Sequence, residues 1–142
     1  MSRNRRAEDN MAAGKGSPQH QAPTLLVVDD DDDLREELAE LFGRVGYNVL
    51  QASNGIEAVE IARDKRPDVV LMDVGMPQLG GVRAAEIMTL LRHTEQVVLM
   101  SGNPEMVAEA ASHRGLAPIV LHKPLSFDVC RRVVDSLAKP GG

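Results

Sequence analysis

The residues of this sequence that could do chemistry each follow a short run of apolar residues. The clearest case is Asp73, which comes directly after the apolar run 69–72 and is followed by a loop with Gly75 and Pro77. Three other apolar runs lead into a pair of carboxylates, a hydroxyl and an ammonium. The five candidate residues are Asp29, Asp30, Asp73, Ser101 and Lys123.

Three carboxylates held together would repel one another, by roughly 4 kcal/mol per pair at 4 Å and an effective dielectric of 20. Lys123 offsets one charge, and a divalent cation would offset the rest. Mg²⁺ fits this role, because it prefers one or two carboxylates together with water and phosphate oxygens. Such a cluster is suited to receive a phosphoryl group, with an aspartate attacking phosphorus to form an acyl phosphate.

The elements that carry these residues follow one pattern. Short apolar runs bounded by turn signals are typical of strands buried on both faces. A segment with helical apolar periodicity follows each strand, and this alternation predicts a parallel sheet covered on both faces. The expected strands are 24–28, 48–52, 68–73, 96–100 and 118–121.

The predicted fold class is α/β, a three-layer, doubly wound (βα)5 fold whose five-stranded parallel sheet has the flavodoxin-like order 2-1-3-4-5. The carboxyl ends of parallel strands lie at one edge of the sheet, so the five candidate residues should converge there. Any one of them has an ordinary explanation as a solvated charge or a helix cap. Only their combination predicts a functional site.

Composition and charge exclude several classes of protein. The 142 residues suit one domain at 23–139, with a disordered tail at 1–22 and a short tail at 140–142. No apolar run approaches the ~18 residues that span a membrane. Cys130 is the only cysteine, so no internal disulfide forms, which fits a cytoplasmic location. Residues 23–142 carry a net charge of −7, which argues against nucleic-acid binding.

Local signals predict further details. Asp33 and Glu36 have capping-box spacing, which predicts the start of the first helix. Pro104 suits the first turn of the fourth helix, in which Ala110 should face inward. Cys130 should lie in the core. The histidines lack metal-ligand spacing and are expected at the surface or at strand ends: His20, His93, His113 and His122.

Taken in order, the motifs resemble the receiver domains of two-component response regulators, from residue 24 to about residue 137. The matching segments are 25–30 (first strand and acidic pair), 70–77 (phosphoacceptor strand and loop), 99–102 (switch hydroxyl) and 122–125 (Lys-Pro motif). Each motif is weak alone, but four in order on alternating strands are specific.

The resemblance implies a phosphoacceptor switch rather than an enzyme, with Asp73 as the phosphorylated residue. Lys123 would pair with Asp73 and then with the phosphoryl oxygens, and Ser101 would turn to hydrogen-bond the phosphoryl group. The fourth helix, fifth strand and fifth helix would form the output face. The implied Mg²⁺ ligands are Asp30, Asp73, the backbone carbonyl of Gly75 and, largely through water, Asp29.

The resemblance also implies partners. The phosphoryl donor would be a sensor histidine kinase or a His-containing phosphotransfer protein, and the output would be contact with a downstream protein. The chain would be a monomer or a weak, phosphorylation-dependent dimer without a membrane partner. Because few residues follow the last expected helix, we expect a stand-alone receiver.

The sequence departs from the family pattern at several positions. Val120 stands where an aromatic residue is usual, which puts the conventional readout in doubt. Gly80 replaces a common aspartate before Gly81, which would loosen the start of the third helix. Gly75 and the polar Asn103 leave the acyl phosphate unshielded, which predicts a short-lived signal.

Three other functions remain open. The chain could be a phosphate sink or relay without its own output. The chain could also be an aspartate-nucleophile phosphatase. Such enzymes usually have a second aspartate two residues after the nucleophile, and Gly75 at that position argues against this function. An interaction module with a silent site is disfavoured by the complete set of five chemical residues.

Overall fold

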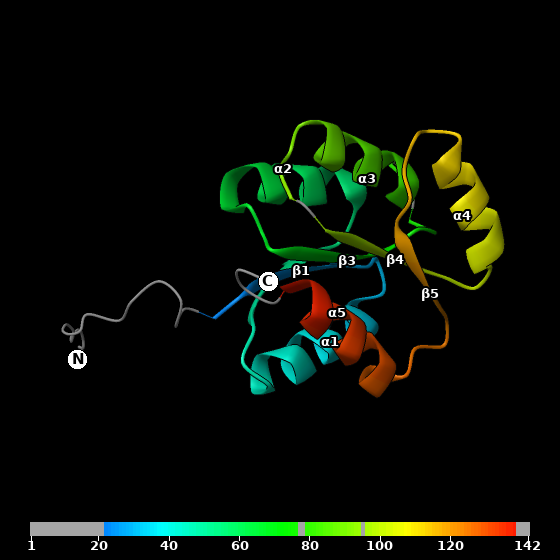
Figure 1. Ribbon diagram of the computed structural model, residues 1–142. Coiled ribbons are helices and arrows are strands. Elements are labelled where there is room, and N and C mark those ends of the chain that lie inside the picture. Colours follow the sequence, from blue (N-terminus) through cyan, green and yellow to red (C-terminus); the bar gives the residue numbers. More distant parts are fainter. Residues whose placement is uncertain (1–21, 77–78, 95, 139–142) are drawn as a thin grey trace.

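The computed structural model describes residues 22–76, 79–94 and 96–138, in which five strands alternate with five helices (Figure 1). The strands are β1 (Thr24–Val28), β2 (Asn48–Ala52), β3 (Val69–Asp73), β4 (Val97–Ser101) and β5 (Ile119–His122). The helices are α1 (Asp32–Arg44), α2 (Gly55–Lys65), α3 (Gly81–Leu90), α4 (Pro104–Ser112) and α5 (Phe127–Ala138). The expected tails lie outside the described residues, except for residue 22.

All neighbouring strands are parallel, and the sheet order is β2-β1-β3-β4-β5, which confirms the predicted fold. The chain reverses its direction of winding beside β1, whose two neighbours are β2 and β3. In open parallel sheets the crevice beyond this switch point is where ligands bind. The acidic pair follows β1 and Asp73 ends β3, so the fold brings the acidic residues to this crevice.

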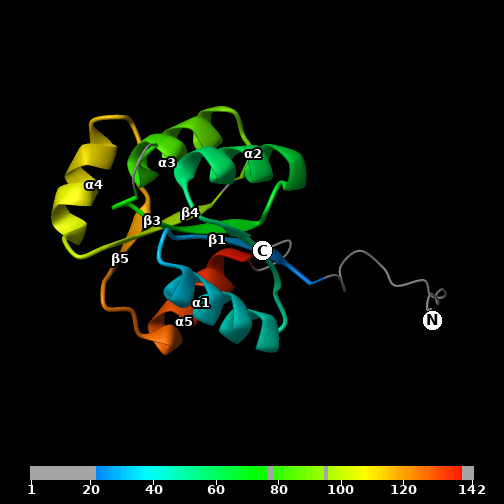
Figure 2. The ribbon, with the colours of Figure 1, turned by 180° about the vertical axis from the view of Figure 1, so that it is seen from behind.

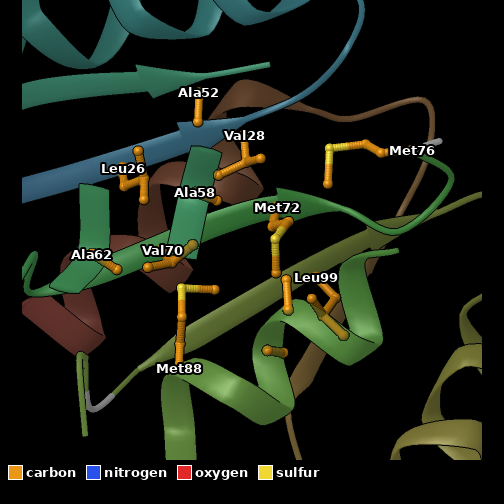
Figure 3. Packing of buried hydrophobic residues seen from close by; sticks show 12 residues of the cluster. Leu26, Val28, Ala52, Ala58, Ala62, Val70, Met72, Met76, Met88 and Leu99 are labelled. Carbon is orange, nitrogen blue, oxygen red and sulfur yellow. The ribbon is translucent and has the colours of Figure 1, made fainter. Parts of the chain in front are cut away.

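The three central strands β1, β3 and β4 bury both faces, because alternate side chains point to opposite sides of the sheet. On one side Leu26, Val70 and Met72 pack with residues of α2 and α3, as Figure 3 shows. On the other side Leu25 and Leu71 pack with residues of α1 and α5. The views from front and back show α2, α3 and α4 covering one face and α1 and α5 the other (Figure 2).

Burial on both faces makes β1, β3 and β4 rigid supports for the residues at their ends. The five residues of β3 are all buried. Fully burying one valine or leucine side chain contributes roughly 1.5–3 kcal/mol relative to leaving it exposed. None of the helices in the described residues is long and apolar enough to cross a membrane.

Several local predictions were wrong. The N-cap of α1 is Asp31, whose side chain accepts the N–H of Leu34, so the helix starts before the predicted Asp33–Glu36 capping box. In a run of five aspartates the spacing alone fits more than one cap. Ala110 is exposed, because only one edge of α4 packs on the sheet.

His93 is also different from the expectation, since it is only 6% exposed. The chain turns sharply after α3, where Arg92 has a positive φ of 58° and the His93 N–H donates to the carbonyl of Met88 at 2.9 Å. Arg66 donates to the carbonyl of Arg92 and closes this turn. This turn buries His93 next to the C-terminal end of α3. Cys130 is buried, as predicted.

Candidate functional site

The three predicted carboxylates come together at the carboxyl edge of the sheet. Asp29, Asp30 and Asp73 each offer an oxygen, and these oxygens all lie within 4.8 Å of one another. Asp29 is 1% exposed and Asp73 is 8% exposed, whereas Asp30 is exposed to solvent. The cluster therefore combines a buried base with one open side.

Asp29 is held in place through its backbone and its side chain. Its N–H donates to the carbonyl of Ala52 at 3.1 Å, which extends the β1–β2 pairing by one residue. Its Oδ1 accepts the N–H of Asp31 at 2.9 Å, and Asp31 in turn caps α1. The first helix and the acidic pair are thus parts of one hydrogen-bonded turn.

Lys123 reaches the cluster from the end of β5. Its Nζ lies 3.2 Å from Asp73 Oδ1 and 3.5 Å from Asp29 Oδ2. The backbone N–H of Lys123 donates to the carbonyl of Ser101 at 2.8 Å. Partial burial lowers the pKa of Lys123, but attraction to Asp29 and Asp73 outweighs this effect and the pKa is raised. The lysine therefore remains an ammonium at neutral pH.

The surroundings of Asp29 favour its protonated form, because they raise the pKa of its carboxyl group. Burial raises the pKa of Asp29 and the charge of Asp73 adds to this effect. The N–H of Asp31 and the ammonium of Lys123 favour the ionised form, but they do not fully compensate. One ammonium among three carboxylates leaves an excess of negative charge, which is the state that a divalent cation would relieve.

Ser101 ends β4, beside the same crevice, and is 6% exposed. Its Oγ accepts the N–H of Asn103 at 2.9 Å. Asn103 is the N-cap of α4, since its side chain accepts the N–H of Met106. The hydroxyl is therefore linked to the start of α4, and any reorientation of Ser101 changes the support of that helix.

The loop after β3 is packed closely around two glycines. An added Cβ at Gly81 would lie 2.6 Å from the carbonyl oxygen of Asp73 and 2.7 Å from the Cα of Val74. An added Cβ at Gly55, which begins α2, would clash with the carbonyl oxygen of Leu79. Since real Cβ atoms do not come this close to other atoms, both positions require glycine.

Gly75 lies on the open side of Asp73. It is exposed, and an added Cβ would lie 3.9 Å from both carboxylate oxygens of Asp73. A longer side chain here would cover the carboxylate, so glycine leaves Asp73 accessible. Pro77 of the same loop lies outside the described residues.

Arg35 is a residue of this site that the sequence motifs did not predict. Its guanidinium donates to the carbonyl oxygen of Asp29 at 2.9 Å, although its own position is in the second turn of α1. The sequence does contain one indication of this role. The helix dipole disfavours a cation near the start of a helix, so another interaction must stabilise Arg35 at that position.

The arrangement fits a Mg²⁺ site that receives a phosphoryl group. Carboxylate oxygens are the ligands that Mg²⁺ prefers, and the metal leaves room for water and phosphate oxygens. The exposed Asp30 and the uncovered face of Asp73 offer such room. Lys123 adds a donor that can pair with phosphoryl oxygens.

Comparison with known proteins matches residues 25–135 to the model of the response regulator receiver domain. Sporulation initiation phosphotransferase F of Bacillus subtilis is 32% identical over 112 residues, which are 78% of this chain and 89% of that protein. PdtaR, a transcriptional regulatory protein of Mycobacterium tuberculosis, is 37% identical over 104 residues, which are 72% of this chain and 50% of that protein. The chain spans only 15% to 50% of the length of such longer relatives.

Solved structures agree with this match. The response regulator protein TrrA of Thermotoga maritima, in complex with Mg²⁺ and BeF, superposes with a TM-score of 0.72 at 27% identity and covers 81% of this chain and 98% of that one. A chain of the CheX–CheY–BeF3–Mg²⁺ complex of Borrelia burgdorferi has a TM-score of 0.72 at 26% identity, and the match covers 82% of this chain and 89% of that one.

Proposed function

This chain belongs to the response regulator receiver domain family, and we propose that it is a switch that accepts a phosphoryl group on Asp73. The donor is a sensor histidine kinase or a His-containing phosphotransfer protein. The observation that carries the proposal is the position of Asp73 among Asp29, Asp30 and Lys123, with oxygens within 4.8 Å and an ammonium at 3.2 Å.

Asp30, Asp73 and the backbone carbonyl of Gly75 would hold Mg²⁺, with Asp29 contributing largely through water. When bound, the metal supplies positive charge that neutralises the oxygens of the transferring phosphoryl group. The separation of the three carboxylates and their excess negative charge support this assignment.

The chain's own residues account for the transfer. An Asp73 carboxylate oxygen attacks phosphorus, a P–O bond forms and the P–N bond to the donor histidine breaks, with the electron pair and a proton passing to the imidazole. Lys123, 3.2 Å from Asp73 Oδ1, neutralises charge on the phosphoryl oxygens. The accessible face of Asp73 beside Gly75 admits the donor.

Phosphorylation adds oxygens that require hydrogen-bond donors. Ser101 supplies one by releasing the N–H of Asn103 and turning toward the phosphoryl group. Because Asn103 caps α4, this change reaches the start of that helix. The two arrangements of Ser101 are the two states that a switch needs.

The output face consists of α4, β5 and α5, and it contacts a downstream protein or a second copy of the chain. Val120 of β5 is partly buried in the core on the side of the sheet that α4 covers, so no aromatic side chain at this position reports the state of Ser101. The change at the α4 N-cap therefore carries the readout. We expect the protein to act in the cytoplasm.

The direct test is phosphorylation with acetyl phosphate and Mg²⁺, followed by intact-mass measurement. The wild-type chain should gain one phosphoryl group and Asp73→Asn should gain none. Asp64→Asn is the matched control, because Asp64 is an exposed carboxylate paired with Arg63 at 3.0 Å. Equal labelling of Asp73→Asn, or no labelling of the wild type, would refute the proposal.

A relay function is the second candidate, because one relative is named a phosphotransferase. A relay passes the phosphoryl group from Asp73 to a second histidine, whereas a switch keeps it until hydrolysis. Incubating labelled protein with His-containing phosphotransfer proteins distinguishes the two. Rapid transfer of the label without a binding partner for the phosphorylated form would favour the relay.

A further inference from the structure

Arg35 is a cation that is almost buried beside the acidic cluster. Its side chain is 12% exposed, although it lies near the start of a surface helix. It makes three polar contacts: Nη1 with the carbonyl oxygen of Asp29 at 2.9 Å, Nη1 with Asp32 Oδ1 at 2.8 Å, and Nε with Gln51 Oε1 at 3.1 Å. These contacts join α1, the end of β1 and β2.

The contact with Asp29 controls the peptide that leads to Asp30. The N–H of Asp29 is held by Ala52 and its Oδ1 by the N–H of Asp31. When Arg35 binds its carbonyl oxygen as well, the Asp29–Asp30 peptide plane has one orientation. Asp30 has an exposed side chain, so the backbone that carries it sets where its carboxylate lies.

We propose that Arg35 is a positioning residue that holds the Asp29–Asp30 peptide so that the Asp30 carboxylate meets Asp73 at the metal site. This inference rests on the proposed function, because it assumes that these carboxylates bind Mg²⁺. Groups that orient metal ligands typically change metal affinity 10- to 100-fold when they are removed.

Arginine is suited to this role by its shape. The planar guanidinium presents donors in a fixed fork, so one side chain binds Asp29 and Gln51 in two directions at once. A lysine has the same charge but a single ammonium at the end of a flexible chain. Arg35→Lys therefore tests whether the fixed geometry of the guanidinium is needed, because the positive charge is kept. Arg35→Gln tests whether the positive charge is needed.

Positioning and simple electrostatics predict opposite effects on metal binding. A cation near the cluster repels Mg²⁺, so if Arg35 acted by charge alone, Arg35→Gln would bind Mg²⁺ more tightly and Arg35→Lys would bind it as the wild type does. If Arg35 positions Asp30, both substitutions weaken binding. The sign of the change in Arg35→Gln decides between them.

The experiment is a calorimetric Mg²⁺ titration of the full chain and its variants, well below their unfolding temperatures. We expect about 10-fold weaker binding in both Arg35 variants. We also expect faster hydrogen exchange of the Asp31 amide in the metal-free variants, because that amide is bound by Asp29 Oδ1. Arg44→Lys and Arg44→Gln are the controls, since Arg44 lies on the same helix and pairs with the exposed Glu40.

Wild-type affinity in both Arg35 variants, or tighter binding by Arg35→Gln, would overturn the positioning role. A wild-type chain that binds no Mg²⁺ would instead overturn the metal site of the proposed function, and with it any role of Arg35 toward a metal. If Arg35→Gln does not fold, Gln51→Ala provides a second test, because it removes the acceptor that orients the guanidinium. Unchanged affinity in Gln51→Ala and Arg35→Lys would then count against the proposal.

Discussion

The ammonium of Lys123 lies 3.5 Å from Oδ2 of Asp29, and it serves a second carboxylate as well, because Asp73 Oδ1 is 3.2 Å away. One cation is thus shared between two nearly buried anions, and Asp30 adds a third. Clusters of this kind reduce stability in the absence of a ligand and are typical of functional sites.

We expect Asp29→Asn to stabilise the metal-free protein at neutral pH and to weaken Mg²⁺ binding. Burial raises the pKa of Asp29 above its ordinary 3.8, so the folded state favours the protonated carboxyl. The stability that this group contributes is present below pH 3.8 and is lost as the pH rises through the folded-state value. The advantage of Asn should therefore disappear as the pH falls toward 3.8.

Urea unfolding of both proteins across this pH range measures the effect. Asp64→Asn is the control, because the pKa of Asp64 is lowered by Arg63 and its removal should not stabilise the fold. An Asp29→Asn protein that is less stable than the wild type at neutral pH would contradict the prediction.

Gly81 and Gly80 should respond in opposite ways to substitution. Gly81→Ala places a Cβ 2.6 Å from the backbone oxygen of Asp73, so it should cost about 1–3 kcal/mol of stability and reduce phosphorylation. Gly80 is the N-cap of α3, has no side-chain cap, and an added Cβ would meet only the Val74 oxygen at 4.0 Å. Gly80→Asp should therefore stabilise the protein by a few tenths of a kcal/mol.

Thermal unfolding and acetyl phosphate labelling of the two variants check this pair. A Gly81→Ala variant with the stability and labelling of the wild type would contradict the prediction, because the loop after β3 would then accommodate the added Cβ.

The phosphoryl group on Asp73 should be short-lived, because Gly75 has no side chain to exclude water from it. An added Cβ at this position would lie 3.9 Å from both oxygens of Asp73. A longer side chain, as in Gly75→Met, should extend the lifetime of the label several-fold and, because it covers part of the carboxylate, should also slow the labelling reaction. Loss of the label over time, measured by mass at neutral pH with Mg²⁺, tests the prediction. A wild-type label that persists for many hours would be evidence against it.

His93 should make stability depend on pH. Burial, together with the charges of Arg66 and Arg63, lowers its pKa from the ordinary 6.5, and its buried Nδ1 has no hydrogen-bond partner among the described residues. The stability that the neutral imidazole contributes is present above pH 6.5 and is lost as the pH falls through the folded-state value.

The variant His93→Leu should remove this part of the pH dependence and, because an unsatisfied polar atom is gone, add about 1 kcal/mol of stability. Unfolding free energies measured below and above pH 6.5 test both effects. His113→Leu is the control, because His113 is exposed. A pH profile of His93→Leu identical to that of the wild type would refute the assignment.

The sequence was sufficient to predict the fold and the meeting of the three carboxylates because both depend on local pattern and connectivity. Four apolar residues before Asp73 require a strand buried on both faces, and alternation with helices requires a parallel sheet. Once the strands are parallel, their carboxyl ends share one edge. Asp29, Asp30 and Asp73 were therefore expected to meet, as the structure shows.

Only the tertiary structure decided how these residues are supported. That Asp29 is buried while Asp30 is exposed and that Lys123 is shared by two carboxylates depend on contacts between distant segments. That Arg35 binds the Asp29 carbonyl depends on how α1 lies against the end of β1. The burial of His93 depends on a turn closed by Arg66, 27 positions before it in the chain. Periodicity places a side chain on a face of its own element, but the neighbouring elements determine what that side chain contacts.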